Sequence, residues 1–242
     1  IHTEIERTKF LERDPNVGTS LVDMYAKCAC LAKAHKVFDT IPCRNAITWN
    51  ALIGGYTEQG YGEEALNLFK KMQSEGVPLD SVTFTCSLKA CATVGAISKG
   101  EEIHAEIARR GILFKDIVMG NTLVDMYAKC GHLAKAQDIL NSLPSRNVVS
   151  WNALIAGYTE HGFAREALDC YEKMKLESVE PDAITIICIL RACGTMRATQ
   201  KGQEIHAEIS RKGLLGEDPD IANSLIDMYN KFQSLTKALQ VF

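Results

Sequence analysis

Long segments of this 242-residue chain return at a spacing of 102 residues, and this periodicity constrains the fold more than any other feature. SLVDMYAKC at 20–28 returns as TLVDMYAKC at 122–130, and WNALIGGYTEQG at 49–60 returns as WNALIAGYTEHG at 151–162. Self-similarity at a fixed period is the signature of architectures in which like units stack on one another. The chain is therefore expected to be a stack of repeats.

The period divides into three kinds of unit, which we call short (31 residues), standard (35 residues) and long (36 residues). Because the chain opens with Ile1 rather than methionine, we expect it to be an internal piece of a longer protein, with partial units that fray at both ends. In chain order, the predicted units are the tail of a long unit at 1–14, short 15–45, standard 46–80, long 81–116, short 117–147, standard 148–182, long 183–218, and the start of a short unit at 219–242.

Each unit has the sequence pattern of two consecutive helices. Apolar residues of the first standard unit recur at i, i+3, i+4 and i+7, the spacing of an amphipathic helix, and these are Trp49, Leu52, Ile53 and Tyr56. Gly60 can then adopt the left-handed conformation that ends a helix. One pair of short helices is unstable alone. We therefore predict an all-α fold, a right-handed α-solenoid superhelix of tandem helix-turn-helix repeats with a single continuous core.

The repeated aromatic residues share the helical phase of the aliphatic core positions. We predict that they pack in the core rather than stack on bases. These residues are Trp49, Trp151, Tyr25, Tyr127 and Tyr229.

Six of the nine cysteines recur at the same spacing as the repeats. Cysteines that recur with a repeat are more simply explained as small, buried packing residues than as a disulfide framework. We expect reduced thiols at Cys28 and Cys130, Cys86 and Cys188, and Cys91 and Cys193.

Composition limits the kinds of partner. No apolar run approaches the roughly 20 residues that cross a bilayer, so we expect no membrane partner. The formal charge is −3, whereas a domain held to nucleic acid mainly by phosphate neutralisation would have a pI above roughly 9. Any nucleic-acid binding must therefore depend largely on the bases and on local placement of charge.

No catalytic motif is present. His104 and Glu106, and likewise His206 and Glu208, match the H-x-E half of a zinc deaminase signature, but zinc needs two further ligands and the chain has no Cys-x-x-Cys. Phosphate-binding glycine loops and the Gly-x-Ser-x-Gly elbow are absent as well. We predict that the chain is not an enzyme and has no catalytic residue, metal or cofactor.

Several segments resemble one known repeat family. The standard unit contains VVSWNALI at 148–155 and ends in EPD at 180–182, the short unit contains LVDMYAKCG at 123–131 and PSRN at 144–147, and the long unit contains GQEIHA at 202–207. In these segments the chain resembles pentatricopeptide repeat proteins of the mixed-length type (PLS subclass) found in plant organelle RNA-editing factors. The resemblance extends over essentially the whole chain.

This resemblance implies sequence-specific binding of single-stranded RNA, with one base for each repeat. It implies the target-recognition array of a C-to-U editing or RNA-processing factor of the chloroplast or mitochondrion, with catalysis supplied elsewhere. The fifth residue of each unit, here called the reader residue, and the last residue, here called the partner residue, would together face a base edge. The RNA would run parallel to the chain.

Carried onto this chain, the resemblance assigns a reader and a partner to each unit. An amide beside a carboxylate favours uracil, and this combination occurs at Asn50 with Asp80 and at Asn152 with Asp182. The short units carry Thr19 with Asn45, which favours adenine, and Asn121 with Asn147, which favours a pyrimidine; Asn223 opens the truncated unit. The long units carry Thr85 with Asp116 and Ile187 with Asp218.

Ile187 cannot form a hydrogen bond with a base, so we expect its repeat to address none. Long units look more like docking surfaces for partner proteins such as editing cofactors. The implied target is 5′-A-U-N-Y-U-N-Y-3′.

Two further sets of residues follow from the same resemblance. Apolar residues three places before the readers would sandwich each base, and these are Ile47, Val82, Val118, Val149 and Ile184. Asn16 and Asp220 depart from this pattern in the short units. Lysines near the ends of first helices would meet phosphates, and these are Lys27, Lys129 and Lys231.

A protein-interaction solenoid of the tetratricopeptide type is the alternative function. The acidic balance and Ile187 favour that alternative, whereas the recurring amide and carboxylate pairs favour RNA. The Trp-x-x-Leu-Gly pattern of tetratricopeptide repeats is absent.

Overall fold

The computed structural model describes residues 15–113, 116–216 and 218–241, and all regular structure in these ranges is helical. The prediction of an all-α fold is therefore confirmed. The partial long unit predicted at 1–14 lies outside the described residues. Among the residues that are described, no helix combines the length and apolar character needed to cross a membrane.

Each predicted unit from residue 15 onward contains a first helix and a second helix. The pairs are α3 (Pro15–Lys27) and α4 (Leu31–Thr40), α5 (Ala46–Glu58) and α6 (Gly62–Ser74), α7 (Ser81–Val94) and α8 (Ile97–Arg109), α9 (Ile117–Lys129) and α10 (Leu133–Ser142), α11 (Val148–Glu160) and α12 (Ala164–Leu176), α13 (Ala183–Met196) and α14 (Thr199–Lys212), and α15 (Pro219–Lys231) and α16 (Leu235–Val241). The short 3-10 helix η1 (Leu214–Gly216) precedes α15. Contacts divide the chain into two compact halves, with the boundary between Cys130 and Gly131.

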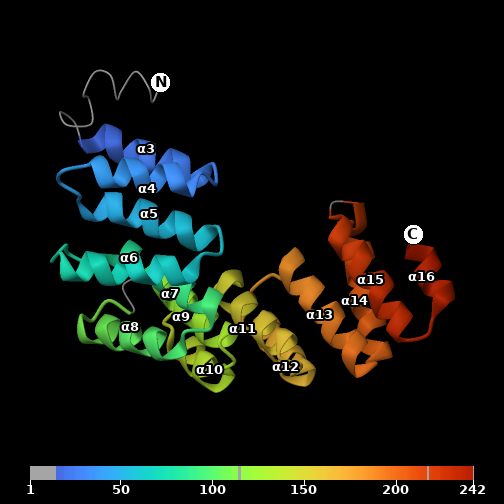
Figure 1. Cartoon of the computed structure of the whole chain (residues 1–242). Coiled ribbons are helices and arrows are strands. Elements are labelled where there is room, and N and C mark those ends of the chain that lie inside the picture. The colour runs from blue at the N-terminus through green and yellow to red at the C-terminus, as the bar shows by residue number, and fades with distance from the viewer. Residues whose placement is uncertain (1–14, 114–115, 217, 242) are drawn as a thin grey trace. The chain divides into compact units, whose positions relative to one another are not determined.

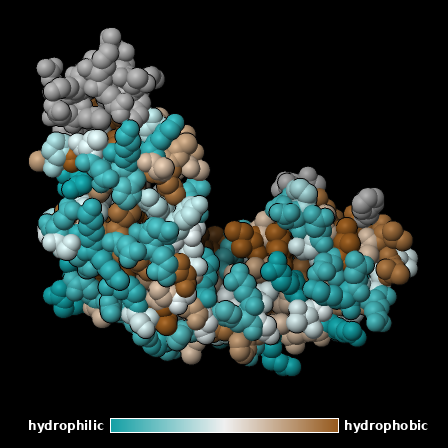
Figure 2. Space-filling model, viewed as in Figure 1, coloured by the Kyte–Doolittle hydropathy of each residue, from teal (hydrophilic) through white to brown (hydrophobic). Residues whose placement is uncertain are grey.

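In the first half, α3, α4, α5 and α6 lie stacked in chain order (Figure 1), and the helix contacts define two rows. The first helices α3, α5, α7 and α9 contact one another in sequence. The second helices α4, α6 and α8 each contact the first helix of their own unit and that of the next. On the face shown in Figure 2, this half is mostly hydrophilic, with apolar residues visible between its helices.

The second half follows the same plan. Its first helices α11, α13 and α15 contact one another in sequence, α12 contacts both α11 and α13, and α14 packs on α13. The 3-10 helix η1 contacts α14 and α15. Each half thus presents its own row of first helices.

Three of the four residues of the apolar face predicted for the standard unit are part of the core, and the fourth, Tyr56, is half-buried. Trp49, Leu52 and Ile53 have no exposed surface, and the Trp49 ring lies edge-on to Phe38 with the centroids 4.6 Å apart. Trp151 is 2% exposed in the second half. The prediction that both tryptophans are core residues is confirmed.

The tyrosine prediction is confirmed at two of its three positions. Tyr127 and Tyr229 are buried, whereas Tyr25 is half-buried, so the core assignment of Tyr25 is wrong. The Tyr127 hydroxyl contacts His104 of the preceding long unit. The residue that corresponds to His104 for Tyr25 is His2, which lies outside the described residues.

All nine cysteines are free thiols. Cys91 and Cys193 are buried, as predicted, and burial raises the pKa of the Cys91 thiol to about 12, which keeps it protonated. Cys28 is exposed, so the packing role predicted for it is wrong. Its counterpart Cys130 points its thiol at the Cys91 carbonyl, 39 residues earlier. The remaining pair, Cys86 and Cys188, is half-buried.

Left-handed residues turn the chain after each first helix of the standard units. Gly60 and Gly162 have φ angles of +82° and +81°, which confirms the prediction for Gly60. The two short units differ at this place, since Gly131 has φ of +78° and Ala29 has φ of +56°. An alanine in this region costs roughly 1–2 kcal/mol, so the first short unit carries backbone strain that glycine relieves in the second.

Candidate nucleic-acid interface

A groove of about 460 Å³ runs along the first helices of the first half. It is lined by residues of α3, α5 and α7, and we call it the first groove. Its lining includes the reader residues Thr19 and Asn50, the predicted sandwiching residues Ile47 and Val82, and Lys27. Residues that are far apart in the sequence therefore share one surface in this half.

A second groove, of about 340 Å³, lies between α13 and α15 in the second half. Its lining includes the reader residues Ile187 and Asn223 together with Arg191, Asp220 and Asp227. The presence of two readers from consecutive units repeats the arrangement of the first groove.

The other reader residues line neither groove. Asn121 and Asn152 are 7% and 8% exposed. Thr85 is half-buried, and its hydroxyl donates to the Ser81 carbonyl within its own helix at 2.8 Å. The structure thus brings together Thr19 with Asn50, and Ile187 with Asn223.

In both standard units the reader amide is hydrogen-bonded at its nitrogen and at its oxygen. Asn50 Nδ2 donates to the Asp80 carboxylate at 2.9 Å, and the Thr83 hydroxyl donates to Asn50 Oδ1 at 2.8 Å. Only 8% of Asn50 is exposed, although it lines the first groove. The same bonds recur, at 2.9 and 2.5 Å, among Asn152, Asp182 and Thr185.

The partner residues have a structural function that the sequence analysis missed, because each one caps the next first helix. The side chains accept from the backbone N–H of the third helical residue at Asn45, Asp80, Asn147 and Asp182. Asp116 and Asp218 accept from the second helical residue instead. Asn and Asp are preferred N-cap types, so the signal was present in the sequence.

The Asp80 carboxylate is stabilised in its charged form. Burial acts to raise the pKa of Asp80, but hydrogen bonds from the Thr83 backbone, the Thr83 hydroxyl and Asn50 outweigh it and lower the pKa below its usual value. The group therefore stays ionised at neutral pH and remains an acceptor for Asn50.

The first short unit connects its predicted pair through a third residue. Thr19 Oγ1 lies 2.7 Å from Thr48 Oγ1, and Thr48 donates both its backbone N–H and its hydroxyl to Asn45 Oδ1 at 3.0 Å. Thr48 holds the same place in its unit that Thr83 holds in the next. The reader and partner of this unit are thus connected through a hydroxyl group.

The residues predicted to sandwich bases are all exposed. Each of them has more than half of its surface accessible, and these residues are Ile47, Val82, Val118, Val149 and Ile184. Large aliphatic side chains are usually buried, and a regular series of exposed ones marks a surface that can be covered. Their contact with bases stays a prediction.

The lysines predicted to meet phosphates are ion-paired within their own helices. The pairs are Lys27 with Asp23 at 2.7 Å, Lys129 with Asp125 at 3.0 Å, and Lys231 with Asp227 at 2.8 Å. An acidic residue four places before a lysine meets it on the helix surface, and this signal was visible in the sequence. Each lysine charge is therefore balanced by a neighbouring carboxylate.

Neither groove has a positive lining. One cation and two anions line the first groove, namely Lys27, Asp23 and Glu58. One cation and two anions also line the second, namely Arg191, Asp220 and Asp227. Phosphate attraction is consequently weak at both surfaces.

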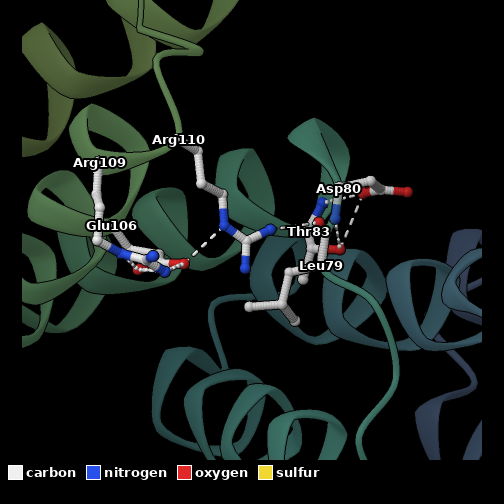
Figure 3. A network of polar contacts seen from close by, with 6 residues as sticks. All are labelled: Leu79, Asp80, Thr83, Glu106, Arg109 and Arg110. Atoms are coloured by element: carbon white, nitrogen blue, oxygen red, sulfur yellow. Dashed lines mark hydrogen bonds and ion pairs between the residues drawn. The ribbon is translucent and has the colours of Figure 1, made fainter.

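The long unit holds the loop that carries Asp80. Arg110 follows α8 and donates from Nη1 to the Leu79 carbonyl at 3.0 Å and from Nε to Glu106 at 2.6 Å (Figure 3). Its guanidinium also lies 5.2 Å from the centre of the Phe84 ring. The long unit thereby holds the residue that directly precedes the partner residue of the standard unit.

The second half has an equivalent contact with different chemistry. Lys212, at the end of α14, pairs with Glu180 at 3.0 Å and with Glu208 at 3.2 Å. Glu180 lies two residues before Asp182. In both halves the long unit therefore anchors the end of the standard unit.

The histidines of the H-x-E segments pack against tyrosines. His104 Nδ1 lies 2.9 Å from the Tyr127 hydroxyl, and His206 Nδ1 lies 2.7 Å from the Tyr229 hydroxyl. Within the described ranges, no group of three His, Cys, Asp or Glu residues could hold a metal ion. These contacts join each long unit to the unit that follows.

Burial of His206 makes stability depend on pH. Burial, and then the Lys237 charge, lower the pKa of His206 from its usual value near 6.5. The unfolded chain therefore binds this proton more readily, so the stability contributed by neutral His206 is complete above about pH 6.5 and is lost as the pH falls through the folded pKa. We expect the Tm to decrease from pH 7 to pH 5, and to decrease less in His206→Gln, in circular dichroism melts at fixed ionic strength. An equal decrease in both proteins would contradict this assignment.

Two family models match the chain. The PPR repeat family model matches residues 44–93 and 146–195, and the PPR repeat model matches residues 121–148. The matched segments include seven of the predicted readers and partners of the standard and short units, namely Asn45, Asn50, Asp80, Asn121, Asn147, Asn152 and Asp182.

Several curated proteins of Arabidopsis thaliana are similar to nearly the whole chain. The chloroplastic pentatricopeptide repeat-containing protein At4g18520 is 39% identical over 234 residues, which are 97% of this chain and 38% of that protein. The chloroplastic protein CRR2 is 39% identical over 237 residues, 96% of this chain and 36% of its own length. The mitochondrial protein At3g09040 is 36% identical over 234 residues, which are 97% of this chain and 23% of that protein. The chain spans less than half the length of these relatives.

The fold also matches solved structures. The crystal structure of PPR10 from maize has a TM-score of 0.72 at 20% identity, covering 92% of this chain and 33% of that one. The structure of PPR10 in complex with an 18-nucleotide psaJ RNA element has a TM-score of 0.77 at 20% identity. The match covers 99% of this chain and 36% of that one. These matches confirm the helical-repeat architecture.

Proposed function

Since the chain belongs to the PPR repeat family, we propose that it binds single-stranded RNA and that successive repeats address successive bases along the row of first helices. The chain recognises its target in this proposal, and any chemistry on the RNA is performed by another domain or protein.

The surroundings of Asn50 carry the proposal. Asn50 lines the first groove together with Ile47 of its own helix and Val82 of the next unit. Ile47 and Val82 are 66% and 55% exposed. Leaving such side chains in water forgoes the free energy of burying them, on the order of 1.5–3 kcal/mol for each fully covered side chain. A base placed between them would cover apolar surface while its edge met the Asn50 amide.

The charges of the grooves favour recognition through bases. The first groove has one cation for two anions, and its lysine is paired with Asp23. Few counterions would be released from the RNA, so the affinity should fall only gently as salt increases. A positively charged groove would show the opposite behaviour.

We also propose a subclass, an RNA target and an organelle for the protein. The mixed lengths of the units support assignment to the PLS subclass, with the proposed target 5′-A-U-N-Y-U-N-Y-3′ and with the long units as proposed docking surfaces for editing cofactors. The chain would act as the recognition array of an editing or processing factor in the chloroplast or mitochondrion, the two organelles named for its relatives.

A protein-interaction solenoid remains the second candidate. The observation in its favour is the absence of net positive charge in both grooves. The exposed aliphatic residues serve either candidate, whereas the hydrogen-bonded amides beside the groove offer a donor and an acceptor that suit a polar, edge-presenting ligand such as a base.

Fluorescence anisotropy with two RNAs tests the proposal. Both RNAs have the same length and flanks, and one carries A-U-A-C-U-A-C while the other carries guanine in place of both uracils. At about 0.15 M salt, we expect the first RNA to bind at least tenfold more tightly, since each wrong base costs on the order of 1–3 kcal/mol. Equal binding of the two RNAs, or no binding by protein that is folded by circular dichroism, would reject RNA recognition in favour of the protein-interaction candidate.

A further inference from the structure

We infer that the hydroxyl group at the third position of the following unit, Thr83 or Thr185, is a specificity-determining residue that fixes the orientation of the reader amide. This inference rests on the proposed RNA-binding function and adds a third residue to each reader pair of the standard units. The argument starts from the hydrogen bonds around Asn50.

Thr83 is completely buried and bonds to both members of the pair. Its hydroxyl lies 2.8 Å from Asn50 Oδ1 and 2.9 Å from Asp80 Oδ1, and the Asp80 backbone N–H approaches it at 3.3 Å. Asn50 Nδ2 points at the carboxylate. If the amide turned over, its oxygen would oppose the Asp80 carboxylate, which only accepts, and the Thr83 hydroxyl would have to give up its hydrogen bond to Asn50 Oδ1 and accept from the amide nitrogen instead.

The orientation of the amide decides which base edge it matches. An amide has two N–H donors and two oxygen lone pairs, and Asp80 and Thr83 each engage one of these groups at Asn50. One donor and one acceptor remain for a ligand, in a fixed order. Uracil presents a carbonyl acceptor where cytosine presents an amino donor. An amide free to turn over can serve both pyrimidines, whereas one held in place distinguishes them.

The third residue differs between units of this chain, which allows units with and without the hydroxyl to be compared. The residue in the third position is Thr48, Thr83, Ser150 or Thr185 after the short and standard units, and it is Met119 or Ile221 after the long units. Both apolar residues are 1% exposed, and the caps beside them still form, through N–H groups of the second helical residue. Capping alone therefore does not require the hydroxyl. The hydroxyl is present where a reader pair is assigned a base and absent after both long units, to which the implied target assigns none.

Thr83→Val tests the inference, because valine keeps the branched shape and removes the hydroxyl. The readout is the ratio of dissociation constants for two RNAs that differ only by uracil or cytosine at the second base. We expect this ratio to fall roughly two- to tenfold, as for the loss of one hydrogen bond. The same ratio at the fifth base, opposite Asn152, should stay unchanged and serves as the control within the same molecule. Thr83→Ser, which restores the hydroxyl, should keep the wild-type ratio.

Each outcome distinguishes the inference from the proposed function. A purely structural role would lower the Tm and weaken both RNAs equally, so an unchanged ratio in Thr83→Val would overturn the inference alone. A wild-type chain without preference at the second base would instead overturn the proposed function. Should Thr83→Val fail to fold, Thr185→Val in the other half makes the same test, with the expected loss at the fifth base and the control at the second.

Discussion

Trp49→Ala is expected to lower the free energy of unfolding by about 3–5 kcal/mol, the usual cost of removing a large buried aromatic ring. Trp49 has no exposed surface, packs edge-on against Phe38 and lies 5.8 Å from the Arg44 guanidinium. The cavity would separate α5 from the second helix of the preceding unit. Since a repeat stack is stabilised by its units and the interfaces between them, this defect should weaken both. Urea unfolding followed by circular dichroism measures the change.

The second half supplies a matched comparison. Trp151 is buried as well, but Leu140 occupies the position in this half that corresponds to Phe38. The aromatic pair, worth about 0.5–1.5 kcal/mol, is therefore missing. Trp151→Ala should therefore cost less than Trp49→Ala. Leu176→Ala, at a side chain that is 85% exposed, should change stability by less than about 0.5 kcal/mol. A Trp49→Ala protein as stable as Leu176→Ala would show that the ring is not part of the core.

Asn50→Thr is expected to move the preference at the second base from uracil towards guanine. The wild-type amide offers a donor and an acceptor that Asp80 and Thr83 hold in place, and threonine replaces them with one hydroxyl. The resemblance to pentatricopeptide repeats assigns guanine to threonine with aspartate. A good base contact discriminates by about 1–3 kcal/mol, so competition between uracil and guanine RNAs should change by roughly five- to 150-fold.

The same substitution elsewhere provides the control. Asn67 is exposed on α6 and does not line the first groove, so Asn67→Thr should leave every base preference unchanged. The fifth base, assigned to Asn152, should also keep its preference in Asn50→Thr. If Asn50→Thr retains the wild-type order of bases, a one-base-per-repeat code cannot operate at this unit.

The helical architecture was predictable because the spacing of apolar residues, the helix ends and the repeat period all indicate the same fold. The spacing of Trp49, Leu52 and Ile53 gives the buried face, Gly60 marks the end of the helix, and the 102-residue repetition shows that the pattern recurs. Each of these signals can be read from the sequence without knowing which residues pack together. The family resemblance grouped Ile47 and Val82 with Asn50, and all three residues line the first groove.

The interactions of the site residues were harder to predict. The lysine at 27 was assigned to phosphate by its place in the repeat, although Asp23 on the same face neutralises it. Asp80 was interpreted only as a partner of Asn50, whereas its first function is to cap α7. Tyr25 and Cys28 are more exposed than their counterparts Tyr127 and Cys130, although the surrounding segments are nearly identical in sequence. Sequence periodicity predicts the same surroundings for equivalent residues in every repeat, whereas their burial differs from one repeat to another.

The hydrogen bonds at the unit junctions bear on how such arrays can be rebuilt. Asn50 is bonded to Asp80 in its own unit and to Thr83 in the next, so a cut after residue 80 separates groups that function together. A cassette for exchanging specificity between arrays would have to run at least to residue 83 and keep a hydroxyl there. A cassette that ends at residue 80 would transfer Asn50 without the Thr83 hydroxyl to which its amide oxygen is hydrogen-bonded.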